Sequence, residues 1–207
     1  MISRRTISTD LNVFAAFTPD LPAAYRQVPF VMLGNISPSL QLHVLDQVER
    51  PRFVLADTMD LWIGTQHRDL LRVIRRATML TLNDSEARQL TGVHNLRQSA
   101  MDILKMGPSY VVIKKGEHGA MLFSKKGIFL VPAYPVEAVL DPTGAGDSFA
   151  GGFMGMLAAR GRADDASVRE SLLAGSAPFG PQAAHSGRRQ PIRAAGRWGV
   201  PRASRAS

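Results

Sequence analysis

The stretch from Asp141 to Phe149 reads Asp-Pro-Thr-Gly-Ala-Gly-Asp-Ser-Phe, and its residue types indicate anion binding. Gly144, Ala145 and Gly146 carry almost no side chain, so a ligand can contact bare backbone there. An apolar run before the stretch predicts a strand, and the spacing of apolar residues after it predicts a helix. The first amides of a helix lack intrahelical partners and carry partial positive charge, so this junction is typical of an anion site.

Asp147 falls in the first turn of that helix, beside the place that the anion would occupy. A carboxylate repels a bound phosphate, so its presence indicates a task, and accepting a proton from an attacking hydroxyl group is the obvious one. The alternative is a tight turn in which Asp147 only caps the helix. The stretch is not a P-loop, because no Gly-Lys-Ser/Thr follows, and not a dinucleotide fingerprint, because Phe149 takes the third glycine position.

Three more glycines, Gly151, Gly152 and Gly155, lie inside the same predicted helix. Each costs about 1 kcal/mol relative to alanine in a helix interior. We therefore expect another element of the fold to approach this helix closely at these glycines.

Two further motifs combine polar residues with glycines. Asn83-Asp-Ser-Glu86 has the spacing of a capping box, in which the asparagine caps a helix and the glutamate reaches back to it. Lys114-Lys-Gly116-Glu-His-Gly119 follows an apolar run and is typical of a hairpin turn. Each motif has this structural interpretation when it is taken alone.

Apolar runs alternate with helical patterns along the chain. The predicted strands cover residues 28–33, 53–56, 79–82, 110–113 and 136–140, with a hairpin at 121–123 and 128–131. Helices are expected after Ser37-Pro38, around 70–74, over 84–90 up to Gly92, from Asn95 to Lys105, after Gly144 and from Asp164. This alternation predicts an α/β fold with a mainly parallel sheet, in which ligands bind beyond the carboxyl ends of the strands. Asn83, Gly116 and Asp141 each follow a strand, so the three motifs should share one edge of the sheet.

The bulk composition bounds the function classes. The chain has 207 residues, of which 45% are hydrophobic and 20% charged, as is ordinary for a globular protein. It has no cysteine, which excludes disulfides and thiolate metal sites and fits a reducing cytoplasm, the location that we expect. No apolar run is long enough to span a membrane, so we expect no membrane partner. The five histidines show no spacing typical of metal ligands.

The formal net charge of +8 comes mostly from the C-terminal end of the sequence. Residues 178–207 hold six arginines and no acidic residue, whereas the rest of the chain has 19 basic and 17 acidic residues. We interpret residues 178–207 as a disordered basic tail and residues 1–177 as the folded part. A tail that binds nucleic acid is the alternative, but we expect no specific nucleic-acid partner.

The string Asp141-x-Thr-Gly-Ala-Gly-Asp-x-Phe149 resembles the second signature of the ribokinase-like, or PfkB-type, carbohydrate kinases. The resemblance implies a three-layer α/β sandwich, incomplete in this chain, and a kinase that transfers the γ-phosphoryl group of ATP to a hydroxyl group of a sugar or nucleoside. It implies that Asp147 is the catalytic base. The backbone from Gly144 through Ala145 and Gly146 would be the anion hole for the transferred group.

The same resemblance implies metal-binding positions. Asp141 and Thr143 match residues that contribute to a monovalent-cation site in many family members, which implies K⁺. Asn83 and Glu86 match an Asn-x-x-Glu motif that acts around Mg²⁺, its water ligands and the phosphates. Magnesium keeps most of its waters and uses few protein carboxylates, so one glutamate acting through water is chemically reasonable.

Gly116 and Gly119 match a Gly-x-x-Gly that borders the nucleotide in the family, so the resemblance implies that they contact ATP together with Asn83. A homodimer is a further implication, since dimers occur among family members. The partners that we expect are therefore ATP, Mg²⁺ and a small sugar or nucleoside.

The resemblance covers roughly residues 10–177, and family members are usually about half as long again. The first strands, the lid and most sugar contacts have no counterpart, so we interpret residues 1–177 as a partial kinase domain. The composition changes abruptly near Ala177, and we hypothesise a change of reading frame there and an internal start at residue 1. Such a chain would expose a sheet edge and apolar surface, with poor solubility and little activity. The alternative function is a non-catalytic nucleotide- or anion-binding remnant of such a kinase.

Overall fold

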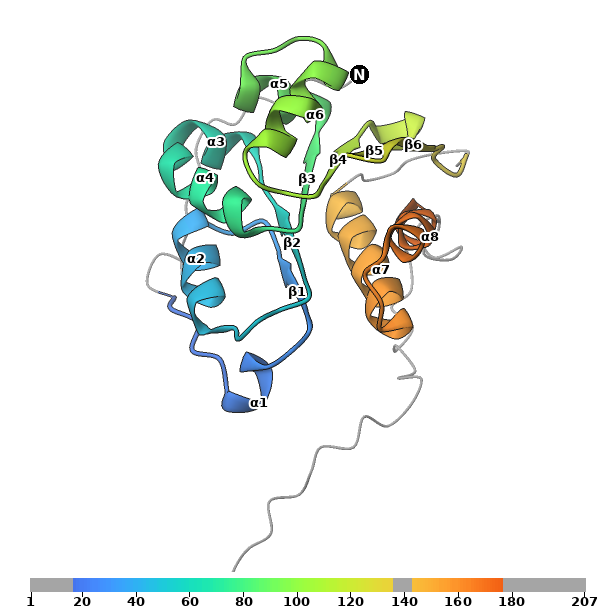
Figure 1. The fold of residues 1–207 in the computed structure, drawn as a ribbon. Coiled ribbons are helices and arrows are strands. Elements are labelled where there is room, and N and C mark those ends of the chain that lie inside the picture. Colours follow the sequence, from blue (N-terminus) through green and yellow to red (C-terminus); the bar gives the residue numbers. More distant parts are fainter. Residues whose placement is uncertain (1–16, 136–142, 177–207) are drawn as a thin grey trace, which may run out of the picture.

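A six-stranded sheet with strand order β1-β2-β3-β4-β5-β6 lies at the centre of the fold (Figure 1). The structure is a computed structural model that describes residues 17–135 and 143–176. Strands β1 to β4 are parallel, and β5 and β6 follow as antiparallel neighbours. The strands are β1 (Phe30–Leu33), β2 (Phe53–Asp57), β3 (Met79–Asn83), β4 (Tyr110–Lys114), β5 (Ala120–Ser124) and β6 (Gly127–Val131). The mainly parallel α/β sheet predicted from the sequence is confirmed.

Helices cover both faces of this sheet and give the fold three layers (Figure 1). α2 to α6 lie on one face, and α7 and α8 lie on the other. The helices are α1 (Ala23–Arg26), α2 (Pro38–Gln47), α3 (Asp60–Thr65), α4 (His67–Arg76), α5 (Asp84–Thr91), α6 (Leu96–Lys105), α7 (Ala145–Arg160) and α8 (Asp165–Ser176), with a 3₁₀ turn, η2 (Gly116–His118), between β4 and β5.

The sheet separates two hydrophobic cores. In β2, Val54 and Ala56 belong to the core beneath α2 to α6, whereas Phe53 and Leu55 belong to the core beneath α7 and α8. All five residues of β2 (Phe53–Asp57) are buried. A strand that is covered on both faces must be largely apolar throughout, which is why β2 is visible in the sequence as an uninterrupted apolar run.

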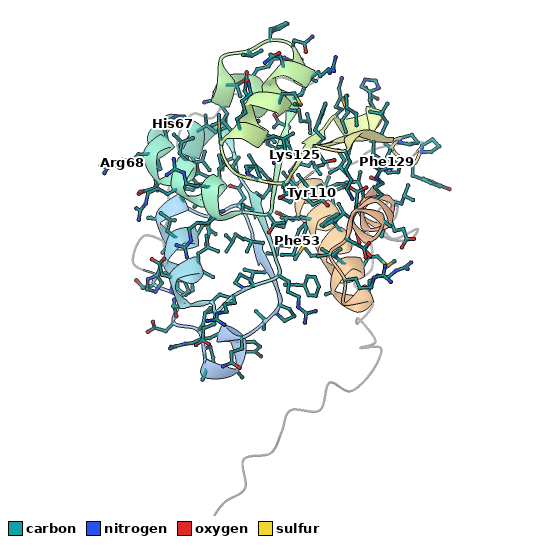
Figure 2. All side chains as sticks on the ribbon, viewed as in Figure 1. Phe53, His67, Arg68, Tyr110, Lys125 and Phe129 are labelled. Atoms are coloured by element: carbon teal, nitrogen blue, oxygen red, sulfur yellow. The ribbon has the colours of Figure 1, made fainter. Side chains whose placement is uncertain are left out.

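Aromatic and cationic contacts fix α7 and α8 against the sheet. The ring centroid of Phe53 lies 6.0 Å from that of Phe153 on α7. Within the sheet it lies 6.3 Å from that of Tyr110 on β4. Figure 2 labels Phe53 and Tyr110. The guanidinium carbon of Arg169 on α8 lies 5.5 Å from the ring centroid of Phe129 on β6. Such contacts stabilise the packing beyond what the burial of apolar area contributes. The contacts of Phe153 and Arg169 therefore help to hold α7 and α8 against the sheet.

Several predicted helix ends are confirmed. Pro38 begins α2, and the side chain of Ser37 accepts a hydrogen bond from the Leu40 amide. α5 ends at Gly92, whose φ of 70° is left-handed and therefore suited to glycine. Helix α3 was not predicted, because it is short and buries only Trp62 and Ile63, too few residues to show a helical repeat.

The prediction that the glycines of α7 mark a close approach is wrong for Gly151 and Gly155. A Cβ atom on either would meet no atom within 4 Å outside its own helix. The close approach is made by Gly175 of α8, where a Cβ atom would lie 2.8 Å from the carbonyl oxygen of Phe149. The two helices do pack tightly, but the glycine that permits the contact lies on α8.

The predicted strand 136–140, Asp141 and the proposed tail at 178–207 lie outside the described residues. Within residues 17–135 and 143–176, no helix combines the length and the apolar character needed to cross a membrane.

Candidate active site

The carboxyl ends of three adjacent parallel strands bring polar residues to one edge of the sheet. Asp57 ends β2 and is in register with Thr81 of β3. Asn83 ends β3 and is in register with Lys114, which ends β4. The edge where ligands bind in such sheets is therefore the edge that carries these side chains.

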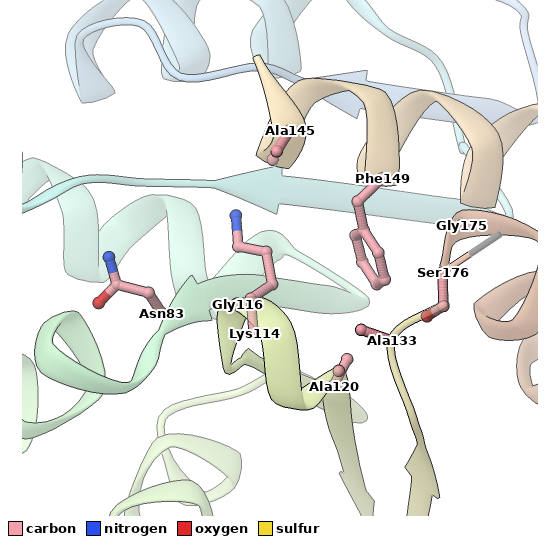
Figure 3. Close-up of a pocket in the computed structure, with 11 residues that line it drawn as sticks. Asn83, Lys114, Gly116, Ala120, Ala133, Ala145, Phe149, Gly175 and Ser176 are labelled. Carbon is pink, nitrogen blue, oxygen red and sulfur yellow. The ribbon is translucent and has the colours of Figure 1, made fainter. Parts of the chain in front are cut away.

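A cavity of about 410 Å³ opens at this edge, between β3, β4 and the first turns of α7 (Figure 3). One part of its lining is polar and the other is mostly small or apolar. Its lining residues are Asn83, Lys114, Gly116, Gly119, Ala120, Ala133, Ala145, Gly146, Phe149, Gly175 and Ser176. All three sequence motifs contribute described residues to this one cavity, as expected if the motifs share an edge of the sheet.

The amino end of α7 presents free backbone donors to the cavity. Gly144 is the N-cap residue, with a φ of 79° that favours glycine, and as a glycine it has no side chain that could cap the helix. The first intrahelical hydrogen bond runs from the Ser148 amide to the Gly144 carbonyl oxygen, at 2.8 Å. The amides of Ala145, Gly146 and Asp147 therefore precede the helical hydrogen-bond ladder, as an anion site requires.

Asp147 lies one residue beyond the lining, in the first turn of α7, and its side chain is exposed. Thr143 is also exposed and directly precedes the N-cap residue. The structure thus places Asp147 beside the candidate anion site. Asp141, the other predicted cation ligand, lies outside the described residues.

Asn83 and Glu86 form the capping box that their spacing predicts. The Asn83 side-chain oxygen accepts a hydrogen bond from the Glu86 amide at 2.8 Å, and Glu86 Oε2 accepts one from the Asn83 amide at 2.7 Å. Glu86 is buried, and this burial is the main reason why its pKa rises from 4.5 to about 7. Asp57 and Asp60 raise this pKa further, whereas the hydrogen bond from Asn83 and the charge of Lys114 lower it.

Gly116 and Gly119 shape the turn between β4 and β5. Their φ angles are 55° and 92°, both in the region that favours glycine. A Cβ atom on Gly119 would lie 2.0 Å from the carbonyl oxygen of Val131. Glycine at this position therefore allows the end of β6 to approach the turn and close one wall of the cavity.

Lys114 is the principal site residue that the sequence analysis missed. Its side chain lines the cavity, and its ammonium group points toward the first turn of α7 (Figure 3). Lys114 Nζ lies 3.1 Å from Asp57 Oδ1 and 3.2 Å from Oδ2. The register of β4 with β3 is the signal that could have identified it, because a residue opposite Asn83 must lie at the same edge.

Small and apolar residues from four elements complete the cavity. Phe149 extends into it from α7 (Figure 3), while Ala120 comes from β5 and Ala133 follows β6. Gly175 and Ser176 contribute from the end of α8. These residues were not predicted as site residues, because their types carry no chemical signal and only the packing of α8 against α7 brings them together.

The donor set suits a metal ion that retains most of its water ligands. Among the described residues, no three acidic or histidine side chains cluster as an ion-binding group. Glu86 offers one buried carboxylate next to the cavity, with Oε2 engaged in the capping box. Magnesium binds through few protein carboxylates and many waters, so this arrangement fits Mg²⁺ better than an ion that needs a full protein cage.

Residues 5–178 match the pfkB family of carbohydrate kinases. The match covers most of the chain, and the chain therefore belongs to this family.

Individual relatives agree with this assignment. The chain is 33% identical over 158 residues to a cytidine kinase of Thermococcus kodakarensis, covering 73% of this chain and 55% of that protein. It is 33% identical over 99 residues to an adenosine kinase of Saccharomyces cerevisiae, covering 42% of this chain and 29% of that protein.

A solved structure confirms the ribokinase-like fold. The crystal structure of aminoimidazole riboside kinase from Salmonella enterica matches with a TM-score of 0.63 at 26% identity, covering 75% of this chain and 56% of that one. The chain thus spans little more than half the length of the Thermococcus relative and of this structure.

Proposed function

We propose that this chain carries the phosphoryl-transfer site of a kinase that moves the γ-phosphoryl group of ATP to a hydroxyl group of a sugar or nucleoside. One observation carries the proposal. The uncapped amino end of α7 and the ammonium group of Lys114 meet in one cavity, with the carboxylate of Asp147 in the same helical turn. The Salmonella relative was solved with aminoimidazole riboside and an ATP analogue, which supports this choice of ligands.

Each part of the site has a role in this proposal. The amides of Ala145, Gly146 and Asp147 would donate hydrogen bonds to the oxygens of the transferred group, where negative charge must be stabilised. The Asp147 carboxylate would accept the proton of the attacking hydroxyl group. As the hydroxyl oxygen bonds to the γ-phosphorus, the bond from that phosphorus to the β–γ bridging oxygen breaks, and ADP leaves with this oxygen.

The two ends of the cavity suit the two ends of a nucleotide. Ala120, Ala133 and Phe149 would contact the adenine, because they supply small or apolar surface for a flat ring. Asn83 and Lys114 would face the phosphates at the polar end, with Gly116 and Gly119 bordering the nucleotide between them.

The cation assignments extend the proposal. Glu86 and Asn83 would orient the water ligands of Mg²⁺, and a bound Mg²⁺ neutralises phosphate charge. A K⁺ ion near Asp141 and Thr143, a homodimer and a cytoplasmic location stay predictions.

The test is the substitution Asp147→Asn, which keeps the size of the side chain and removes its basicity. We expect kcat to fall by about 10²- to 10⁴-fold, the usual contribution of a general base, while the Kd for ATP changes little. Turnover is measured with a panel of nucleosides and sugars, and ATP binding by calorimetry. Asp20→Asn is the matched control, since Asp20 is 91% exposed and precedes α1.

Three outcomes separate the alternatives. Turnover that is lost in Asp147→Asn alone supports the proposal. Turnover that survives this change shows that Asp147 is not the base. Binding of ATP without turnover in the unchanged chain favours the alternative of a non-catalytic nucleotide-binding protein.

A further inference from the structure

The ammonium group of Lys114 lies against the first turn of α7. A Cβ atom placed on Gly146 would lie 3.3 Å from Lys114 Nζ, and no other described residue outside that helix would come within 4 Å of it. Gly146 is not among the residues with positive φ, so its lack of a side chain matters here for space. The missing side chain leaves room for a cation immediately beside the free amides of the helix.

Asp57 holds this cation in place. Its carboxylate accepts hydrogen bonds from Thr81 Oγ1 at 2.9 Å and from the Thr58 amide at 3.1 Å, besides those from Lys114. The side chain of Asp57 is 6% exposed, and that of Lys114 is 20% exposed. The carboxylate is therefore fixed from β2 and β3, whereas the lysine approaches from β4 at the end of a flexible side chain.

We propose that Lys114 positions the phosphate groups of the nucleotide, and that Asp57 is a positioning residue that keeps the Lys114 ammonium group beside α7 before the nucleotide binds. This inference rests on the proposed function. The lysine and the helix amides face the same part of the cavity, so one anion can contact both. A lysine suits this task, because its compact charge and rotatable donors can shift from a carboxylate to a phosphate oxygen without backbone movement.

The alternative is an ion pair that serves only the fold. Buried ion pairs contribute weakly to stability, but removing one partner is costly because the other charge is left unpaired. A purely structural role predicts that changes at Lys114 affect the binding of every ligand alike. A phosphate-positioning role predicts that they affect phosphate-bearing ligands alone.

The experiment compares the binding of ADP, adenosine and pyrophosphate to the full chain by calorimetry. In Lys114→Met we expect the Kd for ADP and for pyrophosphate to rise at least tenfold, while the Kd for adenosine changes less than twofold. Lys114→Arg should recover part of the loss. The matched control is Lys115→Met, because Lys115 is the adjacent lysine and does not line the cavity; it should shift no Kd by more than twofold.

The partnership with Asp57 is tested by a double-mutant cycle. In a chain that retains Lys114, Asp57→Asn should change the Kd for ADP. In a chain that already carries Lys114→Met, the same substitution should have little further effect on that Kd. The double variant also removes both charges together, so it serves where Lys114→Met alone does not fold.

The outcomes distinguish this inference from the proposed function. If the unchanged chain binds neither ADP nor pyrophosphate, both are overturned. If the unchanged chain binds ADP and Lys114→Met binds it equally well, only the role of Lys114 is overturned. Equal losses for ADP and adenosine, or an equal effect of Lys115→Met, also overturn the inference.

Discussion

Glu86 lies in the first turn of α5, and its buried carboxyl group takes part in the capping box beside Asn83, which lines the cavity. Its Oε2 accepts the hydrogen bond from the Asn83 amide, while burial raises its pKa to about 7. With a pKa of about 7, the Glu86 carboxyl group changes its protonation state near neutral pH. Binding of a cation near it would favour the ionised form, so metal affinity at this site should increase as the pH rises through about 7.

The substitution Glu86→Gln tests whether burial raises the pKa of Glu86, through the pH dependence of the free energy of unfolding. Because the pKa of Glu86 rises from 4.5 to about 7 on folding, the folded chain retains a proton that the unfolded chain releases. The free energy of unfolding should therefore fall as the pH increases from about 4.5 to about 7, by up to roughly 3 kcal/mol from this group. Glu86→Gln should abolish this part of the decrease and keep the capping hydrogen bond.

Chemical denaturation at a series of pH values measures the effect. Glu117→Gln is the control, because the Glu117 side chain is 88% exposed, and it should leave the pH profile as it is in the unchanged chain. A profile that is the same in Glu86→Gln and in the unchanged chain would contradict the predicted proton uptake.

At the residue scale, the sequence predicts local structure well where that structure depends on neighbours in the chain. The spacing of Asn83 and Glu86 predicts the capping box, because a helix start has a fixed local geometry. The contact of Lys114 with Asp57 spans 57 positions and depends on how β2, β3 and β4 align. No local pattern contains that alignment, so the sequence around Lys114 predicts a turn but assigns this lysine no role.

Two glycines in helices α7 and α8 should have opposite effects on stability. Gly175 lies where α8 contacts Phe149, and a side chain there would collide with backbone. Gly151 lies on an exposed part of α7 with open space around its Cβ position.

We therefore expect Gly175→Ala to lower the free energy of unfolding by about 1–3 kcal/mol, the usual cost of overpacking. We expect Gly151→Ala, its matched counterpart, to raise that free energy by up to about 1 kcal/mol, because alanine is the better helix former. Thermal and denaturant unfolding measure both changes. Equal effects of the two substitutions would show that α7 and α8 do not pack as described.

At the scale of elements, the strands were the most predictable part. β2, β3 and β4 are covered on both faces, so each is an apolar run that a sequence shows directly. The glycines of α7 were misinterpreted because a sequence shows where glycine is, but not which helix surface meets another element. Only the packed structure identifies Gly175 as the residue at the contact.

The last strand of the described sheet, β6, exposes apolar side chains. Ile128 is 47% exposed and Leu130 is 62% exposed, and β6 pairs only with β5 among the described residues. An edge strand with exposed apolar residues favours pairing with another chain. We therefore expect this protein to associate increasingly as its concentration rises.

Leu130→Lys should reduce this association, because a charged side chain on an edge strand disfavours pairing between chains. Sedimentation velocity over a range of concentrations measures it. Tyr25→Lys on α1 is the control, since Tyr25 is also exposed, at 61%, and α1 lies beside β1, at the opposite end of the sheet from β6 (Figure 1). Association that persists unchanged in Leu130→Lys would exclude β6 as the contact.

At the scale of the whole molecule, alternation of strands and helices was enough to predict the layered α/β fold. The signature around Gly144 predicted the family, which the match over residues 5–178 confirms. Neither the alternation of strands and helices nor the signature predicts the cavity itself. Its walls come from β3, β4, β5, α7 and α8 together, and the shape between them follows from packing rather than from any one segment.

The sequential order of the strands also bears on how the molecule assembles. Each strand from β1 to β6 lies beside its neighbour in the chain, so the sheet can grow strand by strand as the polypeptide leaves the ribosome. Among the described residues, α7 and α8 are the helices that cover the side of β2, β3 and β4 bearing Phe53, Leu55, Met79 and Val112, and they emerge last. Until then this surface is open to chaperones and to other nascent chains. The candidate anion site at the start of α7 forms with these last helices, so binding of a phosphate-bearing ligand there would report that synthesis of the described fold has finished.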